Sequence, residues 1–358
     1  MAKADHKIVS VTIYDVAKAA GVSPATVSIV LNGKRGVSEQ TRGRVLAIME
    51  ELHYTPNLNS RKLTLNKSFN IFVVFGGEAS ALEDLFYTAA LQGVMKECAR
   101  HNYNTVISDS ATDFETSMLK QAMEQRNVDG VIFLQSVQSD IAAALQARRI
   151  PFVVLDAHQM QAGIPSVSCD YRQAAFRAVS YLVELGHTDI AFMGSDSVPA
   201  FHASMLQGYH AALSHFDLPR RHGRIFPVST KKNNIPTAVD AMIGDNALPG
   251  AIFCSSDVVA VELLQAFAAR GVRIPSKVSV VAVDNIVLGH FCYPPLTTLD
   301  VPKDEMGVCA ARMLLGMIAD GSMAQGDIHR TVPAGRMIVR HSAKQVPPSE
   351  ITQSKKEK

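Results

Sequence analysis

Two spacings of hydrophobic residues divide the chain near residue 69. Before that point, apolar residues recur every three or four positions in short segments, which is typical of amphipathic helices. From Phe69 onward, continuous apolar runs such as "FNIFVVF", "DGVIFL" and "KVSVVAV" alternate with stretches of helical spacing. Apolar strands that alternate with helices predict parallel sheets covered by helices on both faces. We therefore expect an α/β protein with a small helical head.

The head, residues 1–55, is predicted to hold three short helices. Each begins with a side chain that can accept a hydrogen bond from the first helical turn, and two carry a further signal: a capping box, or a proline at the first helical position. These signals are Thr12 with Asp15, Ser23 with Pro24, and Ser38.

The body, residues 69–345, is predicted to form two similar lobes. The alternation of strands and helices breaks around residues 157–168, where the sequence is loop-like, and then restarts. We expect the chain to cross between the lobes near residues 165–170, 290–295 and 325–330.

Two segments lack the pattern of a folded unit. Residues 56–68 are basic and offer at most a turn or two of helix, which is too short to be stable alone, so we expect a hinge with conditional structure. The tail, residues 346–358, is polar and is expected to be disordered.

The composition is that of a globular protein: 358 residues, 47% hydrophobic and 19% charged, enough for two or three domains. The N-terminal "MAKADHKIVS" is polar where a signal peptide is apolar, and no apolar run reaches the ~18 residues that a membrane span needs. The five cysteines form no C-x-x-C pair, which favours reduced thiols. We expect a cytoplasmic protein without a membrane partner.

The small net charge of +2 hides an uneven distribution. Residues 1–67 hold ten Lys or Arg and five Asp or Glu, a net +5, so the remainder carries −3. A basic head on a slightly acidic body suggests a polyanionic partner for the head alone. Charge by itself leaves a chance fluctuation equally open.

The second predicted helix, "PATVSIVL", carries no charge, which is unusual for a surface helix. Two helices joined by a tight turn near Gly21 form a helix-turn-helix, whose second helix enters the major groove of DNA. Small hydroxyl and methyl groups allow its backbone to approach the base edges closely. The alternative on these features alone is an ordinary helical hairpin.

The segment "VTIYDVAKAAGVSPATVSIVLNGKRGVSEQTRGRVLAIMEELHYTPN" resembles the head of the LacI-type (lactose/galactose repressor) family. The resemblance continues in "YLVELGHTDIAFMG", "IFCSSDVVAVELLQA" and "YPPLTTLDVPKDEMG", and it covers about nine-tenths of the chain. It implies a body similar to periplasmic sugar-binding proteins, with an effector in the cleft between two lobes. It also implies a transcriptional regulator, a repressor, that binds a pseudo-palindromic operator as a homodimer.

The resemblance assigns DNA contacts position by position. The base-reading positions are Pro24, Ala25, Ser28 and Ile29. The positions that mostly touch phosphate in relatives are Thr12, Tyr14, Ser23, Thr26, Asn32, Ser38, Thr41, Tyr54 and Asn57. In the hinge, Leu63 is the residue expected to wedge into a minor-groove base step, and Ser60 precedes it. Many relatives carry Arg where this chain has Ile29, so the preferred base pair at that position is open.

The resemblance also implies a set of effector-binding residues in the cleft: Phe86, Tyr87, Asp156, Asp170, Phe201, Met205, Ser256 and Asp284. Relatives usually hold Arg at the position of Met205 and more often Asn at that of Ser256. A less polar pocket follows, which favours a nucleoside or glycoside over a sugar phosphate; no natural effector at all is also possible. Aspartates after strands are often turn formers or helix caps instead.

Other function classes have weaker support. The chain contains no G-x-S-x-G, H-E-x-x-H or Walker loop, so we expect no enzyme, no catalytic residues and no cofactor. The histidines at 202, 210, 215 and 222 lack metal-ligand spacing, and we expect no metal. A transport binding protein conflicts with the basic head. The remaining alternative is a cytoplasmic small-molecule binding protein without regulated release of DNA. The tail has no leucine heptads, which favours a dimer over a tetramer.

Overall fold

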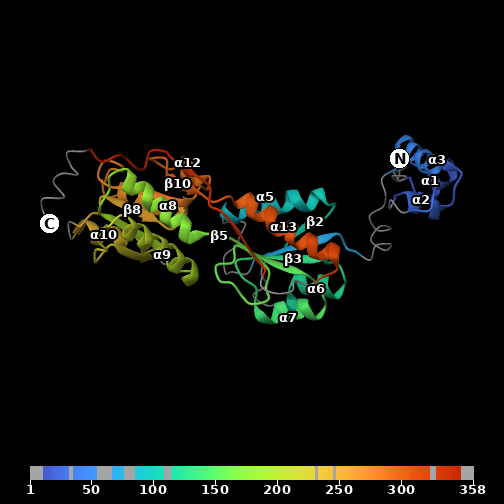
Figure 1. Ribbon diagram of the computed structural model, residues 1–358, viewed down its shortest axis with the longest axis horizontal. Helices are drawn as coiled ribbons and strands as arrows, with labels where there is room; N and C mark the ends of the chain where they lie inside the picture. Colours follow the sequence, from blue (N-terminus) through green and yellow to red (C-terminus); the bar gives the residue numbers. More distant parts are fainter. Residues whose placement is uncertain are drawn as a thin grey trace, which may run out of the picture. The chain divides into compact units, whose positions relative to one another are not determined.

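The chain consists of two separately packed units, Met1–Phe69 and Asn70–Lys358 (Figure 1). The computed structural model describes residues 11–31, 35–54, 67–75, 85–108, 114–229, 233–244, 247–322 and 328–347. The hinge of residues 56–68, apart from 67 and 68, and the tail from 348 onward lie outside the described residues. The expectations for them therefore stay predictions.

The first unit holds the three predicted helices, α1 (Ile13–Ala20), α2 (Pro24–Leu31) and α3 (Glu39–Glu51). Each helix begins where the sequence indicates. Thr12 and Asp15 form a reciprocal capping box, and Ser23 Oγ accepts a hydrogen bond from Thr26 N at 3.1 Å. Ser38 Oγ accepts one from Thr41 N at 3.2 Å. These side chains satisfy backbone donors that have no partner within the helix.

One apolar core joins the three helices. Val16 of α1, Val27 of α2 and Val45 of α3 have no exposed surface and belong to the same cluster. Arg42 of α3 also donates a hydrogen bond to the carbonyl of Val30, near the end of α2, at 3.5 Å. The uncharged helix α2 is therefore held on its inner side by both neighbours.

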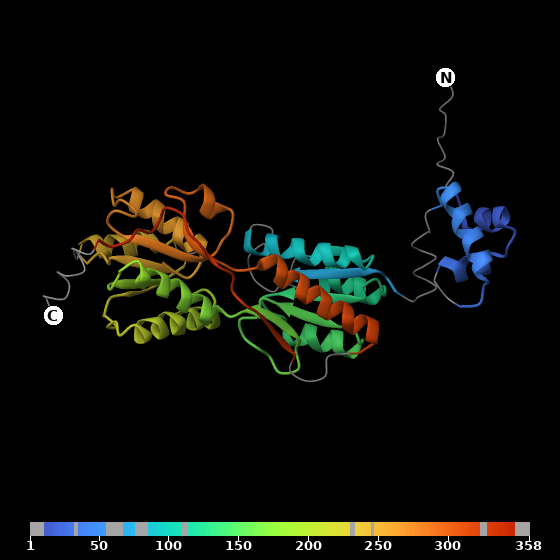
Figure 2. The same cartoon turned by 45° about the horizontal axis from the view of Figure 1, so that its top comes forward.

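The second unit contains two six-stranded sheets, one in each lobe (Figures 1 and 2). The sheet of the N-terminal lobe has the order β11-β5-β4-β3-β1-β2, and its pairings are parallel. Its strands are β1 (Asn70–Phe75), β2 (Asn104–Ser108), β3 (Gly130–Leu134), β4 (Phe152–Leu155), β5 (Ser166–Cys169) and β11 (His329–Val332).

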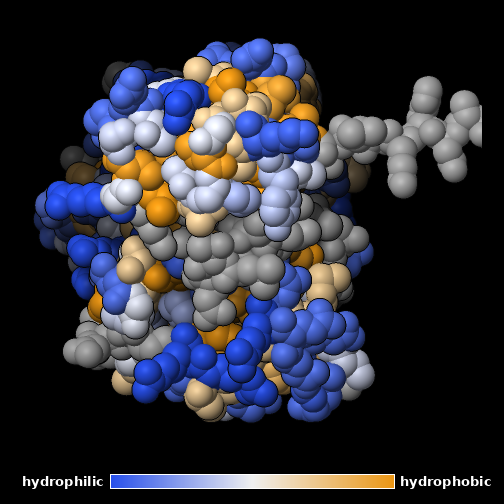
Figure 3. Space-filling view, turned by 90° about the vertical axis from the view of Figure 1, so that its right-hand side faces the viewer, coloured by the Kyte–Doolittle hydropathy of each residue, from blue (hydrophilic) through white to orange (hydrophobic). Residues whose placement is uncertain are grey.

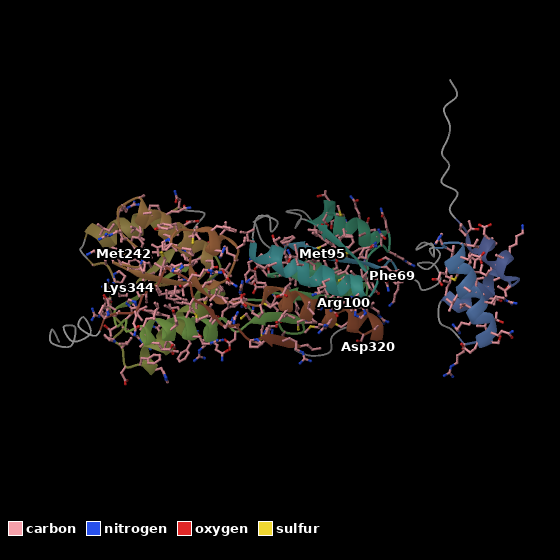
Figure 4. The ribbon with its side chains drawn as sticks, turned by 90° about the horizontal axis from the view of Figure 1, so that it is seen from above. Phe69, Met95, Arg100, Met242, Asp320 and Lys344 are labelled. Atoms are coloured by element: carbon pink, nitrogen blue, oxygen red, sulfur yellow. The ribbon has the colours of Figure 1, made fainter. Side chains whose placement is uncertain are left out.

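Helices cover both faces of this sheet, as continuous apolar strands require. Helices α5 (Leu85–Arg100) and α13 (Lys303–Asp320) pack side by side on one face. The short η1 (Phe114–Thr116), α6 (Met118–Glu124) and α7 (Ser139–Ala147) lie on the other (Figure 1). Figure 4 labels Met95 and Arg100 on α5 and Asp320 at the end of α13.

The sheet of the C-terminal lobe has the order β12-β10-β9-β8-β6-β7 and is parallel except for β12, which runs antiparallel to β10. Its strands are β6 (Ile190–Ser195), β7 (Ile225–Val228), β8 (Ala251–Cys254), β9 (Ser279–Asp284), β10 (Thr297–Asp300) and β12 (Met337–Ile338). Its helices are α8 (Tyr171–Glu184), α9 (Pro199–His215), α10 (Ile235–Gly244), α11 (Asp257–Ala268) and α12 (Leu288–Phe291). The α/β class and the parallel character of the sheets are confirmed, with β12 as the exception.

The chain crosses between the lobes at three points. The first crossing is at Asp170, between β5 and α8. The second is at residues 301–302 and the third at 333–336, so the predicted crossings near 290–295 and 325–330 are wrong. The reason is that the four-residue strands β10 and β11 each keep the chain in one sheet longer than the apolar pattern indicated.

Candidate functional site

The surface of helix α2 has the character expected of a base-reading helix. Val27 and Val30 face the core, whereas Ala25 is exposed and Ser28 and Ile29 are half-buried. The residues away from the core are therefore small or uncharged. Pro24, at the first helical position, is half-buried.

The remaining predicted DNA contacts fall into three groups. Thr12, Ser23 and Ser38 are exposed N-caps, Thr26 and Thr41 follow two of them as half-buried hydroxyl residues, and Tyr14 is 71% exposed. Tyr54 is 8% exposed and belongs to the core of the head, so its ring stabilises the fold. Asn32, Asn57, Ser60 and Leu63 lie outside the described residues.

Exposure alone does not identify a site on this protein. The molecular face shown in Figure 3 mixes hydrophobic and hydrophilic residues, which is ordinary for a folded chain. The cleft between the lobes is better identified by backbone conformation and buried polar contacts.

Three strands that end at the cleft continue into residues with left-handed backbone. Gln135 follows β3 with φ 69°, Asp156 follows β4 with φ 62°, and Asp284 ends β9 with φ 129°. None of the three is glycine, so each conformation carries steric strain. Strained residues of this kind concentrate at binding sites, where the surrounding structure holds them. In open parallel sheets, ligands bind at these carboxyl ends.

The Asp156 carboxylate is the centre of a buried polar cluster. Asp156 is 2% exposed, and each of its oxygens accepts a hydrogen bond from a tyrosine. Tyr87 Oη of α5 donates at 2.6 Å, and Tyr171 Oη of α8 donates at 2.5 Å. Burial and the charge of Asp156 raise the pKa of Tyr171 well above its ordinary value, so the phenol keeps its proton and remains a donor.

Aromatic rings surround this carboxylate. The Tyr171 and Phe201 rings meet edge to face with centroids 4.9 Å apart. The His158 ring packs against both, at 5.5 Å from Tyr171 and 5.0 Å from Phe201. Since His158 follows β4 and the other two rings belong to α8 and α9, these contacts join the two lobes.

A cavity of about 410 Å³ adjoins His158. The ends of β3 and β4, the loop of residues 157–164 and the start of α9 enclose it. Its polar lining, besides His158, consists of Gln135, Ser136, Gln159, Gln161, Ser166 and Ser197. Within the described part of the chain, no Asp, Glu, Lys or Arg lines this cavity.

The structure brings together four of the eight predicted effector residues. Tyr87, Asp156 and Phe201 meet through Tyr171 and His158, and the Phe86 ring packs edge to face on Tyr87 with centroids 5.2 Å apart. The sequence reasoning missed Tyr171 and His158. The sequence did offer a signal for both residues, because each lies beside a predicted effector residue. His158 comes two residues after Asp156, and Tyr171 directly follows Asp170.

The other four have different surroundings. Asp170 caps α8 by accepting from Gln173 N at 2.9 Å, and Ser256 caps α11 by accepting from Val259 N. Met205 has no exposed surface. The backbone carbonyl of Asp284 accepts a hydrogen bond from Lys303 Nζ. Among the described residues, none of the eight predicted side chains lines the 410 Å³ cavity.

A second buried carboxylate lies in the C-terminal lobe. Asp257, the first residue of α11, has no exposed surface and accepts hydrogen bonds from Thr298 Oγ1 at 2.5 Å and from Ile286 N at 2.8 Å. Burial raises the pKa of Asp257 to about 7, although both hydrogen bonds act in the opposite direction.

This pKa makes the stability of the body depend on pH. The folded chain binds a proton at Asp257 more tightly than the unfolded chain does, so stability present below the unfolded pKa is lost as the pH rises through about 7. We expect the free energy of unfolding to fall by at most a few kcal/mol between about pH 4 and pH 7. Urea unfolding of wild type and Asp257→Asn across this range measures it. The difference between the two proteins should change with pH, and parallel curves would contradict the assignment.

Comparison with known proteins places these features in a family. Residues 12–57 match the model of the bacterial regulatory proteins, lacI family, and residues 179–343 match that of a periplasmic binding protein-like domain. Catabolite control protein A of Priestia megaterium is 33% identical over 308 residues, which are 85% of this chain and 92% of that protein. The chain belongs to the LacI family of bacterial regulatory proteins.

Further relatives agree with this. The transcriptional repressor PurR of Vibrio cholerae serotype O1 is 30% identical over 86% of this chain and 92% of its own length. Among solved structures, the lac repressor dimer bound to operator and the anti-inducer ONPF is similar in fold, with a TM-score of 0.71 and 24% identity over 94% of this chain and 99% of that one. A complex of the regulator CelR with cellobiose has a TM-score of 0.67 and 25% identity over 93% and 100%.

As a LacI-family member, the chain is a DNA-binding transcriptional repressor with an effector-binding domain, and the relatives are not enzymes. LacI-family repressors bind operator DNA as dimers and bind small-molecule effectors. No helix of the described residues is long and apolar enough to span a membrane.

Proposed function

We propose that α2 reads base edges in the major groove through Pro24, Ala25, Ser28 and Ile29, as a dimer on a pseudo-palindromic operator. The observation that carries the proposal is the position of these uncharged residues on α2, outside the Val27 and Val30 positions that face the core. The exposed hydroxyls at the helix starts contact phosphate, because helix N-termini favour anions. We propose that Asn32, Asn57, Ser60 and Leu63 complete the contact, and that the protein acts in the cytoplasm, where its DNA is.

The substitution Ile29→Arg tests the reading role of α2. Isoleucine offers a base only apolar contact, whereas arginine can donate two hydrogen bonds to guanine. We expect the binding free energy of Ile29→Arg to favour guanine by about 1–3 kcal/mol at one symmetric pair of operator positions. Selection from randomised operators with both proteins measures it. The same consensus sequence for both would exclude Ile29 from base reading.

We infer that the effector is a neutral molecule with several hydroxyl or N–H groups: a glycoside, a nucleoside or a sugar. The 410 Å³ cavity is lined by amides, hydroxyls and the His158 imidazole, and by no Asp, Glu, Lys or Arg among the described residues. Such groups pair well with ligand hydroxyls, whereas a phosphate would find no Lys or Arg in the lining and would lie close to the Asp156 carboxylate. The cellobiose in the CelR complex supports this ligand class.

Calorimetry of the full-length protein with cellobiose, ribose, adenosine and glucose 6-phosphate tests the inference. We expect binding by at least one neutral compound and none by the phosphate. Tight binding of glucose 6-phosphate alone would overturn the proposed class. A fluorescence titration with operator DNA, run with and without the compound that binds, then measures the direction of control.

A further inference from the structure

The imidazole of His158 occupies the space between the aromatic residues of the cleft and the Asp156 carboxylate. Its side chain is 10% exposed, and Nε2 lies 3.4 Å from Asp156 Oδ2. The ring contacts Tyr171 and Phe201 of the opposite lobe at centroid distances of 5.5 and 5.0 Å. An aromatic wall on one side and a carboxylate on the other are the contacts that a ring-shaped ligand makes in a binding site.

We propose that His158 is an internal occupant of the effector site: its imidazole fills a ligand position, holds the lobes together in the absence of effector, and decides which molecules can replace it. This inference rests on the proposed binding of a small molecule in the cleft. His158 thereby differs from Tyr87 and Tyr171, whose hydrogen bonds position the carboxylate.

The surroundings of the ring explain why it can be displaced. His158 Nδ1 is buried and has no hydrogen-bond partner among the described residues. A buried nitrogen without a partner lowers the stability of the pose that contains it. The ring also belongs to the 157–164 loop, which lines the adjacent cavity, so space for another position lies beside it.

The same contacts define the molecule that replaces His158. Both oxygens of Asp156 already accept hydrogen bonds from tyrosine hydroxyls, so the carboxylate acts as an acceptor. The replacing group must therefore donate an N–H or O–H toward Oδ2 and present a ring to Tyr171 and Phe201. A molecule that does both, without leaving a buried nitrogen unpaired, binds better than the imidazole.

Replacement of His158 by alanine tests the inference with imidazole itself as the probe. In full-length His158→Ala, the vacated space should accept free imidazole about tenfold more tightly than wild type does, by calorimetry. Millimolar imidazole should raise the thermal midpoint of this variant and leave that of wild type nearly unchanged. In the double variant His158→Ala with Asp156→Asn, the effect should weaken, since the carboxylate acceptor is gone.

His187→Ala is the matched control. His187 is also buried, at 5% exposure, but its Nε2 pairs with the Lys344 carbonyl oxygen at 3.1 Å. Equal stabilisation of both alanine variants by imidazole would mean general cavity filling and would overturn the proposal, as would no response of His158→Ala. If that variant does not fold, His158→Phe retains a ring without the nitrogen. It should bind the neutral ligands of wild type more weakly, because a phenyl ring buries no unpaired nitrogen and is therefore harder to displace. Unchanged binding would overturn the proposal.

The outcome is separable from that of the proposed function. Imidazole binding requires no knowledge of the natural effector, so a wild type that ignores the whole ligand panel could still yield an imidazole-responsive His158→Ala. Conversely, ligand binding by wild type together with an unresponsive variant would keep the proposed function and remove the internal occupant.

Discussion

Gly307→Ala is expected to destabilise the body by about 3 kcal/mol or more, because helices α5 and α13 touch backbone to backbone at this glycine. A Cβ on Gly307 would lie 2.0 Å from the carbonyl oxygen of Ala90 and 3.0 Å from the backbone nitrogen of Val94. Gly93 faces the same crossing from α5, where a Cβ would lie 2.0 Å from the Asp304 carbonyl oxygen. Backbone atoms cannot rotate away, so the helices must separate. Urea unfolding followed by circular dichroism measures the loss.

Gly316→Ala on the same helix is the control. A Cβ at Gly316 has nothing within 4 Å, so alanine there adds helix propensity without a clash. We expect a gain of about 0.5–1 kcal/mol. Similar effects of the two substitutions would show that the crossing has room to adjust. Helices α8 and α9 make the same kind of close backbone contact at Gly208, where a Cβ would lie 2.2 Å from the Arg172 carbonyl oxygen.

Local sequence signals predicted the elements of this protein well. Thr12 with Asp15, Ser23 and Ser38 each specify a helix start through a bond made within three residues, so no distant part of the chain is needed. The continuous apolar runs likewise predicted parallel strands buried on both faces. Short strands without a long apolar run, such as β10 and β11, were placed less well, and two lobe crossings were misplaced with them.

The cleft could be predicted only in part, because its contacts join residues far apart in sequence. The hydrogen bond between Tyr87 and Asp156 spans 69 residues, and no periodic pattern reports it. The family resemblance indicated Asp156, but it did not indicate that tyrosine hydroxyls donate hydrogen bonds to both of its carboxylate oxygens. The ring contacts of His158 with Tyr171 and Phe201 likewise form only in the folded chain. The full burial of Met205 likewise depends on the packing of α9 in the folded lobe.

The affinity of the full-length dimer for operator DNA is expected to fall about a thousandfold between about 50 and 200 mM salt. Residues 1–67, the head and the hinge segment, carry a net +5, which a dimer doubles, whereas the rest of the chain carries −3. Binding releases counterions from the phosphates that these cations neutralise, and added salt opposes that release. Fluorescence anisotropy with labelled operator at several salt concentrations gives the slope of log affinity against log salt.

Three further proteins test whether this salt dependence comes from the N-terminal part of the chain. The body alone, from Asn70 onward, is a separately packed unit and should bind no DNA at any of these concentrations, because its net charge is negative. Replacing exposed Arg44 by glutamine in the full chain should lower the slope by about two if each protomer loses one phosphate contact. Arg100→Gln on the body removes the same charge and should leave the slope unchanged. An affinity that is flat across this range would mean that base contacts hold the operator without phosphate contacts, and it would contradict the prediction.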